Sequence, residues 1–168
     1  MPITYQIIDQ HSKGFRHIDA LLALTADIVQ QNAAPYLYPP DRNFFIRTQG
    51  IKCASILAYS GEQLVGYAVL EFLQQWPDYL RQVGPCEHAA MILFTLVHPD
   101  YRGQGINKQM TRMRLDMAKT AGIKRLFSTV HPDNIASWQT LCSVGMVEID
   151  QRPMFDEQVM RKLMFMRL

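Results

Sequence analysis

The sequence predicts a single domain of the α/β (α+β) class, with about seven strands and about four helices. Apolar runs of strand length alternate with stretches of helical periodicity, and turn residues separate them. Of the 168 residues 48% are hydrophobic, and a domain of this length can bury roughly 70% of its unfolded-chain surface. There is no internal repeat, low-complexity tract or linker, so one domain over residues 1–168 is expected.

The first half of the chain predicts three strands and two helices. A strand is expected at Ile3 to Ile8, and a short helix around Asp41 to Gln49. Ala54 to Tyr59 and Leu64 to Phe72 are expected to form a hairpin across S-G-E-Q. Between the first strand and the short helix, a longer helix is predicted, with Ser12 at its N-terminus. Its apolar face is formed by Ile18, Leu21, Leu22, Thr25, Ile28 and Val29.

The second half predicts four strands and two helices. The strands are Met91 to Val97, Leu126 to Val130, Val147 to Gln151 and Gln158 to Arg167. The first helix carries an apolar stripe and ends at Gly122. That stripe consists of Ile106, Met110, Met113 and Met117. The second helix is expected to be capped by Asp133 or Asn134 and to end at Gly145. The loop from Gln74 to His88 is long, which indicates a functional or mobile segment.

The most informative motif is V-H-P-D-Y-R-G-Q-G-I-N, from Val97 to Asn107, where a buried strand passes through a glycine turn into a helix. Gly103 and Gly105 permit positive φ and close approach of a ligand, and the helix N-terminus attracts anions. The turn therefore predicts a phosphate-bearing ligand. It lacks the spacing of a Walker loop and the third glycine of a dinucleotide fingerprint. A plain strand-to-helix connector remains an alternative for the motif alone.

The motif has a specific family counterpart. Arg102 to Asn107 resembles R-x-x-G-x-[G/A], the acyl-CoA pyrophosphate loop of the GNAT N-acetyltransferase superfamily, although Asn107 replaces Gly or Ala. About 25 residues later, Asn134, Ser137 and G-M at Gly145 resemble the family pattern N-x-x-[A/S] followed by G-[F/M]. The predicted order of elements is similar to that family over essentially the whole chain.

The resemblance implies the GNAT acyl-CoA N-acyltransferase fold, with a mixed, mostly antiparallel central sheet. The strands ending at Val97 and Val130 would run parallel and splay apart around the pantetheine arm. Acetyl-CoA would be the acyl donor, with no metal. The residues implied in binding it are Leu96, Val97, Arg102, Gly103, Gln104, Gly105, Ile106, Asn107 and Asn134.

Two catalytic positions of the family are apolar in this chain. Many members carry a glutamate base where Met91 stands and a tyrosine acid where Leu141 stands. The nearest candidates for the base are Glu71, Glu87 and His88, and each is alternatively a solvated charge. The missing acid does not exclude catalysis, because a thiol with pKa ~8.5 is a competent leaving group. Direct transfer in a ternary complex is therefore expected, with Cys142 a small buried hydrophobe and His131 structural.

The acceptor is a primary amine of unknown identity: a small amine, antibiotic, amino acid or protein terminus. Aromatic residues beside prolines are expected either to line its cleft or to pin loops to the core. The candidates for the cleft are Tyr36, Tyr38, Phe45 and Trp76, with Phe44 and Tyr79 beside them. A non-catalytic acyl-CoA-binding regulatory module is the alternative function, and a binding domain for protein or nucleic acid is a further one.

Composition limits the remaining classes. Net charge is +2, and the basic residues are scattered, so nucleic acid is not expected as a partner. Three cysteines, Cys53, Cys86 and Cys142, have no metal-type spacing. No signal peptide or membrane span is indicated, which predicts the cytoplasm. A homodimer is compatible with all of these features.

Overall fold

The computed structural model of the chain describes residues 1–9, 17–80, 85–155 and 158–168. Seven strands and four α-helices follow one another in the order that the sequence predicts. The strands are β1 (Ile3–Ile8), β2 (Cys53–Ser60), β3 (Gln63–Phe72), β4 (Ala89–Val97), β5 (Arg125–Val130), β6 (Val147–Met154) and β7 (Val159–Arg167). The α-helices are α1 (Ile18–Gln30), α2 (Arg42–Thr48), α3 (Ile106–Thr120) and α4 (Ile135–Ser143). Two short 3₁₀ helices, η1 (Asp78–Leu80) and η2 (Pro99–Tyr101), flank β4.

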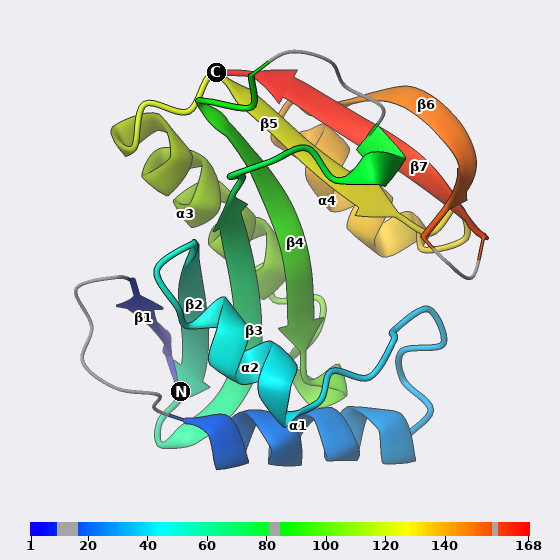
Figure 1. Cartoon of the computed structure of the whole chain (residues 1–168). Coiled ribbons are helices and arrows are strands. Elements are labelled where there is room, and N and C mark those ends of the chain that lie inside the picture. The colour runs from blue at the N-terminus through cyan, green and yellow to red at the C-terminus, as the bar shows by residue number, and fades with distance from the viewer. Residues whose placement is uncertain (10–16, 81–84, 156–157) are drawn as a thin grey trace. The chain divides into compact units, whose positions relative to one another are not determined.

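The strands form one mixed sheet in the order β1-β2-β3-β4-β5-β7-β6, which confirms the predicted fold class (Figure 1). β4 and β5 pair in parallel, Ala89 with Arg125 through Ile92 with Ser128. The pairing described between them ends there, although β4 continues to Val97 and β5 to Val130. The other pairings described, β1 with β2, β5 with β7 and β6 with β7, are antiparallel.

The chain divides into two compact units. The first unit comprises Met1–Val69 and Phe94–Met110, and the second comprises Leu70–Leu93 and Thr111–Leu168. The boundary passes through β3, β4 and α3, so no linker separates the units. The prediction of a single domain stays a prediction.

In the first unit, a buried polar network stands in the middle of an apolar core. The hydroxyl of Tyr67, which is fully buried, lies 2.7 Å from Thr48 Oγ1 and 2.9 Å from Ser55 Oγ. Ser55 Oγ in turn donates to the Thr48 carbonyl at 2.7 Å. The ring of Phe45 packs edge-on against Tyr67. These bonds fix the end of α2 onto β2 and β3, because a buried hydroxyl is costly without a partner.

Burial raises the pKa of Tyr67 to about 12. The folded state therefore retains this proton when the unfolded chain, with a tyrosine pKa of 10.0, has lost it. Stability from this group is complete below pH 10 and should fall by roughly 3 kcal/mol as pH rises to about 12. Urea unfolding across this range should show the decline, and Tyr67→Phe should remove the part that Tyr67 supplies. Tyr38→Phe, at an exposed tyrosine, should leave the decline in place; if it removes the decline too, Tyr67 is not the source.

The second unit buries both faces of its part of the sheet. On one face, Ala90 and Ile92 of β4 pack with Leu115 of α3 and Leu141 of α4. On the other face, Ala89 and Met91 pack with residues of the β3–β4 connection and of β5 to β7. Figure 1 shows α4 and the segment containing η1 on opposite sides of β5 and β7. The β3–β4 connection is thus anchored where the structure describes it.

Helix ends agree with the sequence, while two helix faces differ from it. Asn134 caps α4 by accepting from the Ser137 amide, and Gly122 and Gly145 end α3 and α4 at positive φ.

In α1, Leu24 is buried, whereas Val29 is 48% exposed, so the prediction that Val29 lies on the buried face is wrong. The predicted start at Ser12 lies outside the described residues. In α3, Met113 and Met117 are only partly buried, while Arg114 is fully buried and donates to Thr111 Oγ1 at 2.9 Å.

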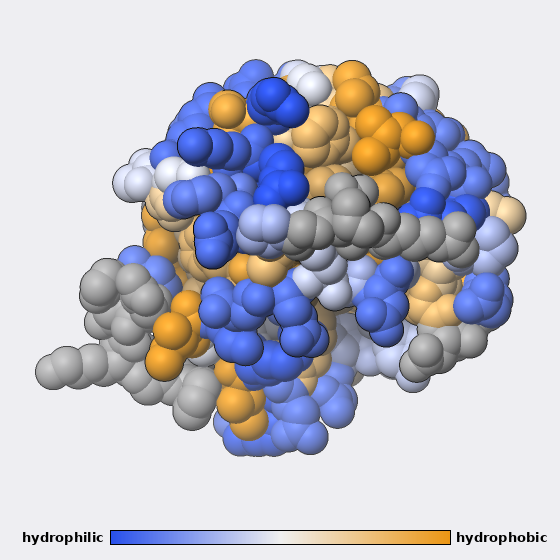
Figure 2. Space-filling model, turned by 45° about the horizontal axis from the view of Figure 1, so that its top comes forward, coloured by the Kyte–Doolittle hydropathy of each residue, from blue (hydrophilic) through white to orange (hydrophobic). Residues whose placement is uncertain are grey.

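Hydrophilic residues make up most of the face in Figure 2, and hydrophobic residues gather among them in small groups. Within the described ranges, no helix is both long and apolar enough to cross a membrane.

Candidate functional site

The glycine turn predicted to bind phosphate follows β4 in the first unit. His98 and Pro99 open the short helix η2, and the Arg102 amide closes it by donating to the Pro99 carbonyl at 3.1 Å. Gly103 and Gly105 then take φ values of 76° and 77°. These are left-handed conformations that favour glycine, so the predicted positive φ is confirmed at both glycines.

Four successive amides lie between the short helix η2 and the first described helical bond of α3. The first described helical bond of α3 runs from the Gln109 amide to the Gly105 carbonyl at 2.9 Å. Among the described residues, no acceptor is recorded for the amides of Gly103, Gln104, Gly105 and Ile106. We call residues 103–106 the nest, because successive N–H groups in such a turn form a concave anion site. The helix dipole of α3 adds positive potential at the same place.

The two glycines of the nest adjoin open space. A Cβ atom built on Gly103 or on Gly105 would meet no other atom within 4 Å. Ile106, in contrast, is buried and anchors the start of α3 in the core. The arrangement can bind a phosphate or another anion through backbone amides alone. In the part of the chain that the structure describes, no group of three or more His, Cys, Asp or Glu residues could hold a metal ion.

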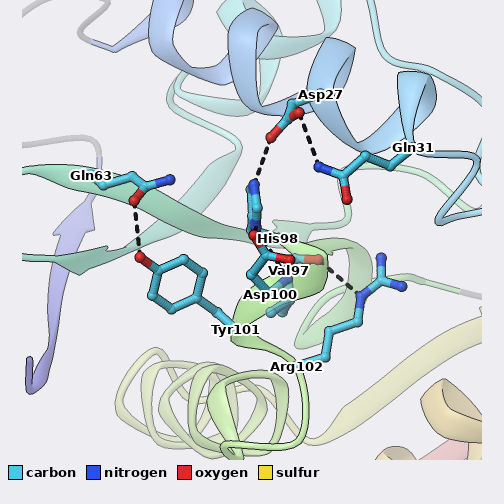
Figure 3. Close-up of polar contacts among 8 residues, drawn as sticks. All are labelled: Asp27, Gln31, Gln63, Val97, His98, Asp100, Tyr101 and Arg102. Atoms are coloured by element: carbon cyan, nitrogen blue, oxygen red, sulfur yellow. Dashed lines mark hydrogen bonds and ion pairs between the residues drawn. The ribbon is translucent and has the colours of Figure 1, made fainter.

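Side chains from η2 hold the nest to neighbouring elements (Figure 3). His98 is 5% exposed, and its Nδ1 accepts from the Asp100 amide at 3.2 Å. Its Nε2 therefore carries the proton and donates to the Asp27 carboxylate of α1 at 2.6 Å. On another side, the Tyr101 hydroxyl donates to Gln63 Oε1 of β3 at 2.9 Å. These bonds tie the turn before the nest to α1 and β3.

The Arg102 side chain is also engaged. Its Nε donates to the Val97 carbonyl at 3.2 Å, and its Nη1 donates to the Ala33 carbonyl at 2.6 Å. Partial burial lowers the pKa of this guanidinium, which still carries its charge at neutral pH. The Arg102 amide, which the sequence places among the phosphate donors, is already bonded within η2. The part of Arg102 in binding acetyl-CoA stays a prediction, and its side chain makes two backbone contacts that the motif did not indicate.

The Asp27 carboxylate offers a test of the bracing. Hydrogen bonds from Gln31 Nε2, at 3.0 Å, and from His98 lower its pKa. Because the folded pKa is lowered, the stability that these bonds supply is present above the ordinary carboxyl pKa and is lost as pH falls through the folded value. Gln31→Ala should raise the Asp27 pKa, measured by carboxyl-carbon NMR titration. Gln30→Ala, at the exposed neighbouring position, should not change it. Equal titration curves for the wild type and Gln31→Ala would contradict this account.

In the second unit, Met91 occupies the position of the family's base and is 1% exposed. The Leu73 amide donates to the Ala89 carbonyl at 3.0 Å, which places Leu73, directly after β3, opposite Ala89 at the start of β4. Two residues further along each antiparallel strand, Glu71 falls opposite Met91. Leu70 and Phe72 pack on the helix-covered face, so Glu71, alternating with them, projects from the face that Met91 shares. Glu71 is half-buried and has interactions of its own.

The other two candidates for the base lie before β4. Glu87 and His88 are exposed, and their carbonyls accept from Arg125 and from the amides of Lys124 and Arg125. His88 has a φ of 59°. Among the described contacts, none joins either side chain to Met91. Of the three candidates, Glu71 is therefore the one that the strand register brings to Met91.

Asn107, Asn134 and Leu141 have distinct surroundings. Asn107 is half-buried in the first turn of α3 and has interactions there. The Asn134 Oδ1 atom accepts from Ser137 as the cap of α4, which leaves its side-chain NH₂ group as a donor for a ligand. Leu141 is 4% exposed in the core of the second unit, and Cys142 beside it is exposed rather than buried as expected.

The aromatic candidates for acceptor binding separate by burial. Phe45 is fully buried against Tyr67, so its ring belongs to the core and does not line an exposed cleft. Tyr36 and Tyr38 lie on the exposed segment after α1, where Tyr38 is 81% exposed. Trp76, in the second unit, packs edge-on against Phe127 beneath the Arg125 guanidinium.

Sequence reasoning missed two polar side chains of interest. The Tyr79 hydroxyl donates to Met91 Sδ at 3.2 Å, whereas the sequence places Tyr79 only beside the aromatic candidates for the acceptor cleft. Asp27 is not among the residues that the sequence singles out, and its bond to His98 joins residues 71 positions apart. Neither contact leaves a periodic signal in the sequence.

Comparisons with known proteins agree with this architecture. The family model "Acetyltransferase (GNAT) family" matches residues 18–146. Among curated proteins, no sequence matches significantly. Solved structures are similar over nearly the whole chain, at identities that establish the fold alone.

Three of these structures illustrate the likeness. The ribosomal-protein-S18-alanine N-acetyltransferase from Escherichia coli is 18% identical, with a TM-score of 0.69 over 98% of this chain and 94% of that chain. The yncA protein from Salmonella typhimurium, solved with its cofactor acetyl-CoA, is 16% identical, with a TM-score of 0.72 over 99% and 94%. The PaiA N-acetyltransferase from Thermoplasma acidophilum, in complex with coenzyme A, is 14% identical, with a TM-score of 0.72 over 100% of both chains.

Proposed function

Because the chain belongs to the acetyltransferase (GNAT) family, we propose that it is an acetyl-CoA-dependent N-acetyltransferase. It transfers the acetyl group directly to a primary amine within a ternary complex. The observation that carries the proposal is the nest, where four successive amides have no acceptor among the described residues and the two glycines adjoin open space. A pyrophosphate supplies the acceptor oxygens that these amides lack.

Donor binding is assigned residue by residue. The amides of residues 103–106 bind the pyrophosphate, with Asn107 following in the first turn of α3. The pantetheine arm pairs with the backbone at Leu96 and Val97, whose carbonyls can each accept a second bond. Asn134 contributes its side-chain NH₂ group. These assignments rest on the family motifs, and coenzyme A or acetyl-CoA in two similar structures supports the choice of donor.

The chemical step needs a neutral amine. A primary amine with pKa ~10.4 is almost entirely protonated at pH 7, so a proton must leave before attack. We assign its removal to Glu71, directly or through water, because the register places Glu71 opposite Met91. The amine nitrogen then bonds to the thioester carbonyl carbon, the C–S bond breaks, and coenzyme A departs as a thiolate. The second amine proton goes to solvent or to the thiolate, which completes the balance without an acid at Leu141.

For the acceptor, we propose that Tyr36 and Tyr38 supply exposed aromatic surface in the first unit. In the second unit, we propose that the partly buried Trp76 contributes the exposed part of its ring. Phe45 is left out of this proposal, since its burial gives it a packing role.

A non-catalytic acyl-CoA-binding module is the second candidate, favoured by the burial of Met91 and Leu141 at both family positions. Two measurements distinguish the candidates. Acetyl-CoA should raise the melting temperature at saturating concentration, and free thiol should then appear when a panel of amines and peptide N-termini is added. Stabilisation without thiol release on any acceptor supports the module. Absence of stabilisation at saturating acetyl-CoA overturns both candidates.

A further inference from the structure

The Arg102 side chain ties the residue directly before the nest to a segment far away in the sequence. Its backbone directly precedes Gly103, while its Nη1 donates to the Ala33 carbonyl at 2.6 Å. A second bond, from Nε to the Val97 carbonyl, orients the side chain, as Figure 3 shows. Arg102 therefore connects the residues just before the nest with the segment that follows α1.

The segment that Arg102 holds contains Ala33 to Tyr38 and has neither helix nor strand. Its described backbone bonds are local: the Ala33 amide donates to Ile28 and the Leu37 amide donates to Ala34. The helix before it is fixed by the bond between Asp27 and His98. Such a segment, with exposed residues and local bonds, opens at low free-energy cost unless something else holds it.

We propose that Arg102 is a positioning residue, which couples occupation of the nest to the order of residues 33–38. The inference rests on the proposed binding of the acetyl-CoA pyrophosphate at the nest and extends it to the segment that bears Tyr36 and Tyr38.

The physical reason is that the same side chain must be ordered for both interactions. Ordering an arginine side chain costs up to about 2 kcal/mol, and an anion at residues 103–106 restrains this neighbouring cation. Once the guanidinium is restrained, its bond to Ala33 forms at a lower entropic cost. By reciprocity, an ordered segment favours the anion to the same extent. The nest thus prepares the acceptor side of the first unit when the donor is bound.

Hydrogen exchange of the Ala33 and Leu37 amides tests this coupling. Coenzyme A is added to the wild type, Arg102→Met and Tyr101→Phe, each at the concentration where its melting temperature no longer rises. Tyr101→Phe is the matched control, since it removes a bond of the same loop to β3 instead of to Ala33. Pantetheine, which lacks the pyrophosphate, is the ligand control.

Coenzyme A should slow exchange of these two amides by about tenfold in the wild type and in Tyr101→Phe, in line with ordinary coupling energies. Pantetheine should not slow it, and Arg102→Met should lose the effect. If Arg102→Met no longer binds coenzyme A, its ligand-free exchange at Ala33 and Leu37 decides: faster than wild type supports the coupling, and unchanged overturns it.

Unchanged or faster exchange in the wild type with coenzyme A bound overturns the inference alone. Equal protection in Arg102→Met does so as well. No binding of coenzyme A by the wild type overturns the proposed function, and the coupling with it.

Discussion

Gly105→Asp is expected to weaken acetyl-CoA binding by about 100-fold or more while leaving the protein folded. The new carboxylate enters the open space over the nest, where a phosphate would meet a like charge. The φ of 77° adds backbone strain, which is small for aspartate because aspartate tolerates this region. Calorimetric titration with acetyl-CoA measures the affinity, and the melting temperature of the free protein reports the strain.

Gly122→Asp is the matched control for this experiment. Gly122 has a φ of 72° in the turn after α3, and the one atom within 4 Å of a Cβ built there would be His88 Nδ1, at 3.9 Å. The backbone strain is therefore similar, but no nest is present. Equal loss of acetyl-CoA affinity in both variants would mean that strain alone explains the effect, and the anion site would be abandoned.

Glu71→Gln is expected to slow turnover by roughly 10² to 10⁴-fold, the range for loss of a general base. Affinity for acetyl-CoA should hardly change, because the carboxylate acts on the amine and not on the pyrophosphate. The limb of the rate-versus-pH profile that reports the base should also disappear. Steady-state release of free thiol, measured across pH with the best acceptor of the panel, provides both quantities.

Glu87→Gln provides the comparison with the rival position before β4. Its side chain is exposed, and the described contacts there involve its carbonyl, so turnover should stay close to that of the wild type. A larger loss in Glu87→Gln than in Glu71→Gln would move the base to the rival position. A rate-versus-pH profile that Glu71→Gln leaves unchanged would refute the role of Glu71.

Local signals account for what the sequence predicts well. Strands such as Met91 to Val97 are continuous apolar runs, and glycines at 103, 105, 122 and 145 stand where positive φ is needed. These features depend on residues close together in the chain, as does the Asn134 cap of α4. The turn and its free amides could therefore be predicted from spacing alone.

Long-range contacts account for what the sequence does not predict. The bond of Arg102 to Ala33 spans 69 residues, and that of His98 to Asp27 spans 71. The burial of Arg114 and the exposure of Val29 likewise depend on which elements pack beside each helix. Helical periodicity predicts the direction in which a side chain projects from the helix axis, but not which element packs on that side. The side-chain partners at the site could therefore be identified only from the structure.

The position of β6 at the edge of the sheet has a consequence for solubility during folding and storage. An edge strand with exposed apolar residues, here Val147 and Ile149, can template pairing with another molecule. Pro153 removes one backbone donor from this strand, and the ion pair between Asp150 and Arg152 places charge between the apolar half and the proline. The C-terminal half of β6 is thereby a poor template, and Pro153→Val should make the protein more prone to aggregate.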